Sequence, residues 1–435
     1  MSLDDAERQV CEEVARRSDD LVALASELIW FDTTARMPGE PAREEAQLQE
    51  LLAGRLRSAG AEVDLWEPSA DEMAGRPLVP PGLDFDGRPQ LVARFPGAGS
   101  GRRLMLNGHI DVVSGEPVDA WTSHPFRPEV RDRKLYGRGA CDMKGGVACT
   151  VFAAEVLAGL GIDLQGDLLV ATNTDEESSG AGGSAIVAHG ITADAGIVAE
   201  PTGFDVWITC RGSEYATVSV PGRPGHAEHR QPDFTEGGAV NAIERATVVI
   251  DAIRRLRERW AEREGFAHPY LAPPDVVPTM ARSGEWPVTY PASFDLTMAV
   301  LYLPIQADAQ GWGSAVRAEV EQYLLAEVAR DPWLRGHPPT VDWWSNGVMP
   351  MEIMDSEPIV GTLLDASESV GHPSRLAGLD SWYDGAAYTI LAGIPSVGFG
   401  PTSVSHTVDE HVPVDDLVTC AQALAVSAMR FCGRE

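Results

Sequence analysis

Two histidines and five carboxylates follow apolar runs or stand beside glycine-rich turns in this chain. They are His109, Asp111, Asp142, Glu176, Glu177, Glu200 and His406. Imidazole and carboxylate groups gathered in one crevice suit zinc, and also manganese or cobalt. Several carboxylates brought together repel one another unless cations neutralise them. The residue types therefore predict a site for two divalent metal ions, with one carboxylate of the Glu176–Glu177 pair left to act as a general base.

Each of these residues also has a simpler explanation when it is taken alone. His109 and Asp111 are two residues apart, so on a strand their side chains point to the same side. A carboxylate in that position can fix the tautomer of a metal-binding histidine, but the same pair could also face solvent at a turn. Asp142 could cap a helix, and Glu176–Glu177 could favour a helix dipole. The metal hypothesis therefore depends on their joint occurrence.

The elements that carry these residues alternate between apolar strands and helices. We expect strands at 91–95, 104–106, 167–172 and 195–199, and helices at 44–59 and 147–160. This alternation is typical of an α/β domain, in which sites lie outside the carboxyl ends of the strands. A mixed-sheet catalytic domain is the predicted fold.

The pattern changes after about residue 207. We expect one long strand at 206–220, followed by a helix at 237–263, strands at 276–282 and 294–303, a helix at 315–329 and a strand at 340–344. The order β-α-β-β-α-β is that of a ferredoxin-like domain. Since the earlier pattern returns after residue 348, we predict a catalytic metal-binding domain formed by 1–207 and 349–435, with a second domain, 208–348, inserted into it.

Composition excludes several classes of partner. The formal net charge of -31 disfavours nucleic acid and anionic membranes, because both would repel the protein. The sequence has no run of about 18 apolar residues, so no membrane span is expected. The six cysteines form no CxxC pair, and the N-terminus lacks a secretory pattern. These features predict a cytoplasmic protein with reduced thiols.

Five motifs carry a family resemblance. In chain order they are Asn-Gly-His109-Ile-Asp-Val-Val, Gly-Arg-Gly-Ala-Cys-Asp142-Met-Lys-Gly-Gly, Thr-Asp-Glu176-Glu177-Ser, Glu200-Pro-Thr and His406-Thr-Val-Asp-Glu. Together they resemble the two-zinc metallopeptidase and amidohydrolase family of acetylornithine deacetylase, succinyl-diaminopimelate desuccinylase, aminoacylase and glutamate carboxypeptidase. The resemblance covers nearly the whole chain. It implies a metal-dependent hydrolase that cleaves the C–N (amide) bond of a small molecule such as an N-acyl amino acid or a short peptide.

The resemblance also implies a division of the metal ligands. His109 and Glu200 would hold one ion, Glu177 and His406 the other, and Asp142 would bridge the two. Zinc is the first choice of metal, with manganese and cobalt as alternatives. A cis peptide is common in the family just after the residue that matches Asp142.

Two further carboxylates receive catalytic roles from the resemblance. Asp111 would orient His109. Glu176 would be the general base that activates the water between the ions, and the resulting hydroxide would attack the amide carbonyl. Glu176 would then pass the proton to the leaving nitrogen.

The inserted domain would serve as a lid and dimerisation domain. Gly-Arg-Pro-Gly-His226-Ala matches the family motif whose histidine helps to stabilise the oxyanion from the partner subunit. Asn241 matches the start of the lid helix and is a candidate substrate contact. These matches predict a homodimer or a higher homo-oligomer that closes around a small-molecule substrate.

One position departs from the family pattern. Many relatives carry an arginine in a strand Asp-x-Arg-x-x-Pro, where it binds the substrate carboxylate, and the matching position here is Leu301. A leucine cannot make that contact, so Arg282 in the preceding strand is a candidate replacement. The region of the lid near Trp286 and Tyr290 is also aromatic. Hydrolysis of an aromatic amide or an aromatic amine substrate is therefore an alternative.

Two other classes of function were weighed. A non-catalytic metal-binding relative of the same fold would be expected to lose the base, and Glu176 is present. Nucleotide binding by the loop Gly137–Gly146 fails because Lys144 precedes the two glycines, whereas a phosphate-binding loop needs the order Gly-Lys-Ser/Thr.

Overall fold

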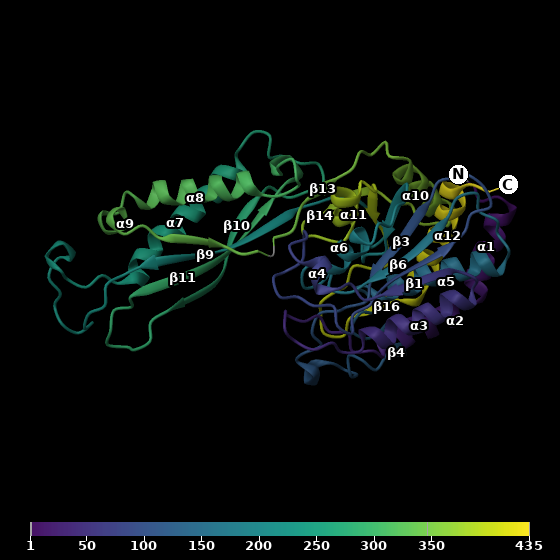
Figure 1. The fold of residues 1–435 in the computed structure, drawn as a ribbon, viewed down its shortest axis with the longest axis horizontal. Coiled ribbons are helices and arrows are strands. Elements are labelled where there is room, and N and C mark those ends of the chain that lie inside the picture. Colours follow the sequence, from purple (N-terminus) through teal and green to yellow (C-terminus); the bar gives the residue numbers. More distant parts are fainter. Residues whose placement is uncertain (1, 346, 435) are drawn as a thin grey trace. The chain divides into compact units, whose positions relative to one another are not determined.

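The computed structural model describes residues 2–345 and 347–434 and divides into two compact units (Figure 1). Unit 1 consists of Met1–Thr209, Met351–Gly378 and Tyr383–Glu435. Unit 2 consists of Cys210–Pro350 and Leu379–Trp382. The sequence pattern assigned Leu379–Trp382 to the other part of the chain. No helix in the described residues is both long and apolar enough to cross a membrane.

A mixed nine-stranded sheet is the centre of unit 1. Its order is β1 (Glu62–Trp66), β2 (Gln90–Phe95), β6 (Leu168–Asn173), β3 (Leu104–His109), β7 (Ala195–Val198), β15 (Ser396–Gly398), β8 (Val206–Cys210) and β13 (Met351–Glu352), and β14 (Leu376–Leu379) also pairs with β8. Strand β3 runs parallel to β6 and β7, and β15 runs parallel to β7. Strand β2 is antiparallel to both β1 and β6. The predicted mixed α/β fold is confirmed.

Helices cover both faces of the middle of this sheet. All six residues of β3 are buried, as expected for a strand that is packed on both sides. A Cβ atom on Gly108 would lie 2.8 Å from Val147 of α5 (Lys144–Gly159). Asn107 points to the other face, where its amide donates to Asn173, which in turn donates to Asp384 at the start of α11 (Gly385–Ala392). Helix α5 therefore lies on one face and α11 on the other.

The remaining helices of unit 1 belong to these two layers. Helix α3 (Glu45–Ser58) lies near α5, since Gln49 of α3 accepts a hydrogen bond from Thr172, the neighbour of Asn173. The helices that pack around α5 and its neighbours are α1 (Asp5–Arg16), α2 (Ser18–Ile29), α10 (Pro358–Ser369) and α12 (Val414–Cys432). Helix α6 (Ala181–Ala188) packs against α11. The short helix α4 (Ala70–Met73) and a small sheet of β16 (His411–Pro413), β5 (Lys134–Tyr136) and β4 (Glu129–Arg131) complete the unit.

Unit 2 has a four-stranded antiparallel sheet and two long helices. Its elements are β9 (Gly212–Pro221), α7 (Ala242–Ala261), β10 (Asp275–Ser283), β11 (Ser293–Tyr302), α8 (Ser314–Val328), the short α9 (Pro332–Gly336) and β12 (Thr340–Trp343). The sheet order is β10-β11-β9-β12, and each neighbouring pair is antiparallel. The helices and the sheet enclose one apolar core that includes Val218, Val249, Val300 and Leu324.

The expected single strand at 206–220 is wrong, because the chain leaves one sheet and enters the other at Arg211. The backbone N–H of Arg211 donates to the carbonyls of Leu379 and Ser381. Its guanidinium donates to the carbonyls of Asp380 and Pro273. These bonds separate β8 from β9, although the apolar pattern runs on without a break.

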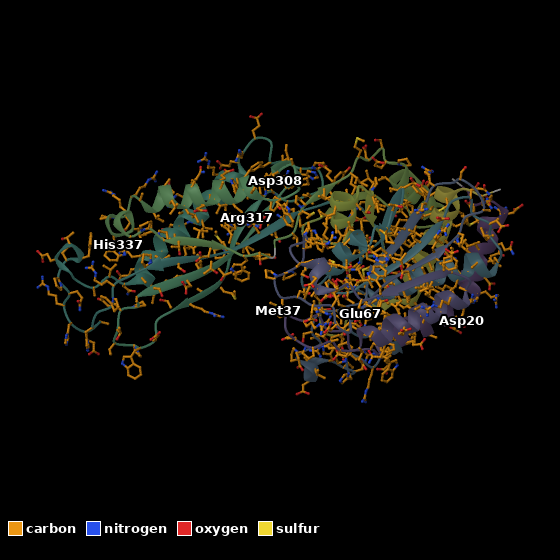
Figure 2. All side chains as sticks on the ribbon, in the orientation of Figure 1. Asp20, Met37, Glu67, Asp308, Arg317 and His337 are labelled. Atoms are coloured by element: carbon orange, nitrogen blue, oxygen red, sulfur yellow. The ribbon has the colours of Figure 1, made fainter. Side chains whose placement is uncertain are left out.

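The start of α8 is held by two acidic residues of unit 2. Arg317 of α8 pairs with the fully buried carboxylate of Glu214 on β9. Asp308, which Figure 2 labels, lies in the loop before the helix. It accepts hydrogen bonds from the backbone N–H of Trp312, at 2.9 Å, and from the hydroxyl of Ser314, the first residue of α8, at 2.6 Å. A buried carboxylate without such a partner would destabilise the unit.

Two glycine substitutions test the packing of unit 1. Gly108→Ala should lower the free energy of unfolding by about 1–3 kcal/mol, because the new Cβ would overlap Val147 and Met143. Gly54→Ala, in α3, should raise it by about 0.5–1 kcal/mol, since nothing lies within 4 Å and alanine is the better helix former. Denaturant unfolding of the two variants measures both changes. Equal effects would contradict the layer arrangement around β3.

Candidate functional site

The polar residues predicted from the sequence gather at one edge of the sheet in unit 1. Strands β6, β3, β7 and β15 are neighbours and run in the same direction. Their carboxyl ends lead to Glu176 and Glu177, to His109, to Glu200 and to the loop that carries His406. Neighbouring parallel strands bring such ends together at a single edge.

Asp142 stands between the two histidines. Its Oδ1 atom lies 3.2 Å from Nε2 of His109, and its Oδ2 atom lies 3.3 Å from Nε2 of His406. Asp142 belongs to the turn before α5, and the peptide bond to Met143 is cis. One carboxylate therefore presents a different oxygen to each imidazole.

Three glutamates complete the cluster. Oε1 of Glu177 lies 3.1 Å from Nε2 of His406. Oε2 of Glu176 and Oε1 of Glu200 lie 3.8 Å and 4.0 Å from Nε2 of His109. One ligand atom from each of His109, Asp142 and Glu177 falls within 4.8 Å of the others, which is an arrangement able to hold a metal ion. The structure thus brings together the side chains of all seven strand-end residues, since the carboxylate of Asp111 also lies 3.6 Å from Nδ1 of His109.

Asp111, the seventh, acts mainly on the backbone. Its two carboxylate oxygens accept hydrogen bonds from the N–H groups of Glu176, at 3.2 Å, and Glu177, at 3.0 Å. Its carbonyl oxygen lies 2.9 Å from Nδ1 of His109, whereas its carboxylate is 3.6 Å from that atom. A carbonyl can only accept, so Nδ1 carries a proton, and Nε2 is the ring nitrogen that faces Asp142. The group that orients His109 is the carbonyl of Asp111.

Burial and crowding shift the pKa values of several groups in the cluster. Burial raises the pKa of Glu176 and of Glu200 well above the usual range. Burial opposes the protonated form of His109, but the hydrogen bond to Asp142 and the charges of the glutamates outweigh it and raise the pKa. Hydrogen bonds with Asp142 and Glu177 raise the pKa of His406 to about 10. A cluster of this kind holds protons until cations take their place.

Glu410 is a site residue to which the sequence analysis gave no role. Its side chain is fully buried, and its Oε1 atom accepts hydrogen bonds from the N–H groups of Cys141, at 2.9 Å, and Asp142, at 3.1 Å. Arg138 pairs with its other oxygen. The signal in the sequence was its place at the end of the motif that begins with His406.

A buried amide network beside the cluster was also missed. The Nδ2 group of Asn107 donates to Oδ1 of Asn173 at 2.9 Å, and that of Asn173 donates to Oδ2 of Asp384 at 2.5 Å. Tyr388 of α11 also donates to Asn173. Burial raises the pKa of Asp384 to about 6. The network joins β3 and β6 to α11, and no local pattern links these distant residues.

The other predicted site residues belong to unit 2. His226 is exposed in the loop after β9, where its ring stacks on that of His229 at 4.1 Å between centroids. Asn241 caps α7 by accepting a hydrogen bond from the N–H of Ile243 at 3.0 Å. Arg282 is exposed on β10, opposite Asp295 of β11. Their roles towards substrate stay predictions.

Residues 105–430 match the sequence model of Peptidase family M20/M25/M40. The chain belongs to this family. It is 30% identical to an acetylornithine deacetylase of Myxococcus xanthus, over 96% of this chain and 99% of the relative. It is 28% identical to an N-formyl-4-amino-5-aminomethyl-2-methylpyrimidine deformylase of Halalkalibacterium halodurans, over 96% of each chain.

Solved structures of the family share the fold. Human carnosine dipeptidase 1 superposes with a TM-score of 0.70 at 15% identity, over 99% of each chain. YXEP of Bacillus subtilis, described as a dinuclear metal binding peptidase, superposes with a TM-score of 0.64 at 13% identity, over 96% of this chain and 99% of the other. The resemblance drawn from the five motifs is confirmed, and the protein is a metal-dependent hydrolase of the family.

Proposed function

We propose that the protein is a two-metal amidohydrolase that removes an acyl group from the nitrogen of a small molecule. The observation that carries this proposal is the position of Asp142, whose two carboxylate oxygens face His109 and His406 separately. One ion would be held by His109, Glu200 and Asp142. The other would be held by Asp142, Glu177 and His406.

The residues present fit divalent cations. The donors are imidazole nitrogens and carboxylate oxygens, a set that suits zinc first and manganese or cobalt as alternatives. Glu200 is 4% exposed, and its Oε1 atom, which faces His109, has no hydrogen-bond partner among the described residues. A buried carboxylate oxygen without a partner is costly, and a cation beside it would remove that cost.

The residues of the chain can carry the proton transfers of amide hydrolysis. The bound ions would supply a water of lowered pKa and polarise the amide carbonyl. Glu176 lies at the cluster, with Oε2 3.8 Å from Nε2 of His109, so its carboxylate can accept the proton from that water. It then delivers the proton to the leaving nitrogen as the C–N bond breaks. Asp111 fixes the backbone N–H of Glu176 and thereby the position of the base.

The substrate proposed first is a small N-acyl amine with an aromatic ring and no carboxylate to be bound. Leu301, where many relatives have an arginine, supports this choice, because its side chain cannot bind a carboxylate. The similarity to the pyrimidine deformylase over 96% of both chains supports it as well. An N-acyl amino acid or a short peptide is the second candidate, supported by the similarity to the acetylornithine deacetylase. In that case Arg282 would bind the carboxylate.

Unit 2 is proposed as the inserted lid and dimerisation domain of a homodimer. Its strand order and its β-α-β-β-α-β sequence of elements support a ferredoxin-like domain. The exposed His226 would stabilise the oxyanion in the partner subunit's site, and Asn241 would contact substrate. All six cysteines are buried, and buried reduced thiols would suit a cytoplasmic protein.

Glu176→Gln tests the general base. We expect kcat/KM to fall about 10²- to 10⁴-fold on N-formyl, N-acetyl, N-succinyl and aryl-amide substrates, because the amide cannot take a proton. Metal content should stay the same. Glu50→Gln, on the exposed side of α3, is the control. Unchanged turnover in Glu176→Gln would show that another group is the base.

Metal binding should strengthen as the pH rises. Since the pKa of His406 is about 10 in the protein without cations, each ion must displace protons in order to bind. The affinity for Zn²⁺ or Co²⁺ should increase about tenfold per pH unit for each proton released, between pH 6 and pH 8. Competition with a chromophoric chelator measures this slope. A flat profile, or fewer than two ions per chain at saturation, would contradict the ligand set.

Leu301→Arg tests the substrate class. A new guanidinium should raise kcat/KM for N-acyl amino acids about tenfold or more, while turnover of aryl amides falls or is unchanged. Arg282→Ala is the companion variant. If the native chain already prefers N-acyl amino acids and Arg282→Ala abolishes that preference, the second candidate substrate is the right one.

A further inference from the structure

The turn that carries Asp142 is held from outside by one carboxylate. Oε1 of Glu410 accepts hydrogen bonds from two successive backbone N–H groups, those of Cys141 and Asp142, at 2.9 Å and 3.1 Å. The side chain of Glu410 is fully buried. A charged acceptor that binds two adjacent amides restricts rotation of the peptide between them, because any rotation would break a charge-assisted hydrogen bond.

The carboxylate of Glu410 is itself held in place. Arg138, which is 3% exposed, pairs with its second oxygen and donates from Nη2 to the carbonyl of Ser114 at 3.0 Å. The guanidinium also lies over the ring of Trp121, 5.0 Å from its centroid. The carbonyl of Glu410 accepts a hydrogen bond from the N–H of Gly137 at 3.0 Å. These contacts leave Glu410 one orientation, with one oxygen on the arginine and the other on the turn.

The segment that ends in Glu410 also supplies His406. Its earlier part makes a second link to the same turn, because the carbonyl of Thr402 accepts a hydrogen bond from Sγ of Cys141 at 3.1 Å. One stretch of chain therefore places an imidazole 3.3 Å from Oδ2 of Asp142 and fixes the backbone of that aspartate. The segment 402–410 therefore contacts both the backbone and the carboxylate of Asp142.

We propose that Glu410 is a positioning residue that sets the orientation of the Asp142 carboxylate between His109 and His406. The contacts of Glu410 are with backbone amides and with Arg138, so it acts through Asp142 and holds no ion itself. The inference builds on the proposed function, in which Asp142 bridges two ions.

The test compares Glu410→Ala and Glu410→Gln with the native chain. Titration with Co²⁺ gives stoichiometry, stepwise affinity and the visible absorption spectrum, none of which requires turnover. Glu410→Ala should weaken binding of at least one ion tenfold or more, change the cobalt spectrum and lower kcat with little change in KM. Glu410→Gln keeps an acceptor oxygen for the two amides, so it should restore a large part of the affinity and the native spectrum.

Asp409→Asn is the matched control. Asp409 is the neighbour of Glu410, and its carboxylate accepts hydrogen bonds from the N–H and hydroxyl of Thr122. Its φ of 56° is one that asparagine tolerates well. Its replacement also removes a charge from the same loop, but cobalt binding and kcat should match those of the native chain.

The outcomes separate this inference from the proposed function. If the native chain binds two Co²⁺ ions and a folded Glu410→Ala binds them with the same affinity and spectrum, the positioning role is wrong. If Glu410→Ala does not fold, Glu410→Leu combined with Arg138→Met removes both buried charges and leaves the two amides without the Glu410 acceptor. Native affinity and a native cobalt spectrum in that folded variant would also overturn the inference. If the native chain itself binds fewer than two ions, the proposed function fails first.

Discussion

Repulsion between buried carboxylates is the constraint on which the rest of unit 1 depends. Asp142, Glu176, Glu177 and Glu200 crowd around His109 at the edge of one sheet, with little solvent to screen them. Such a group is stable only when protons or cations neutralise it. The raised pKa values of Glu176 and Glu200 reflect this cost. The fold therefore creates a site that favours cation binding, which agrees with membership of a metal-dependent family.

The sheet brings the clustered carboxylates together, and two further carboxylates, those of Asp111 and Glu410, hold the backbone that carries them. Four neighbouring parallel strands end at the same edge, so residues far apart in sequence meet there. Asp111 then fixes the N–H groups of Glu176 and Glu177, and Glu410 fixes that of Asp142. Both acids accept hydrogen bonds from backbone amides of the residues that form the cluster. Some carboxylates are thus candidate metal ligands, whereas Asp111 and Glu410 fix the backbone positions of those ligands.

Specificity depends on different residues from those that carry the chemistry. In the proposed mechanism the cluster of unit 1 would act only on the amide group and the attacking water, which many amide substrates share. The rest of the substrate would then be recognised by other residues, and Leu301 on β11 has no group that could bind a carboxylate. Relatives that span nearly the whole chain include both a deformylase and a deacetylase, so the family alone leaves the acyl group and the amine open.

The sequence by itself determined the family, the mixed α/β class and the identity of the clustered residues, because strand ends and glycine-rich turns leave local patterns. It could not determine which atoms meet. Asp142 presents one oxygen to each histidine, and Glu410 holds the turn that carries Asp142. These contacts join segments far apart in the chain. The bond from His109 to the carbonyl of Asp111 is local, but spacing alone did not distinguish it from a bond to the carboxylate. The order of strands in the sheet decides such contacts, and local residue spacing does not predict that order. The break between two sheets at Arg211, which lies inside a continuous apolar pattern, is an example.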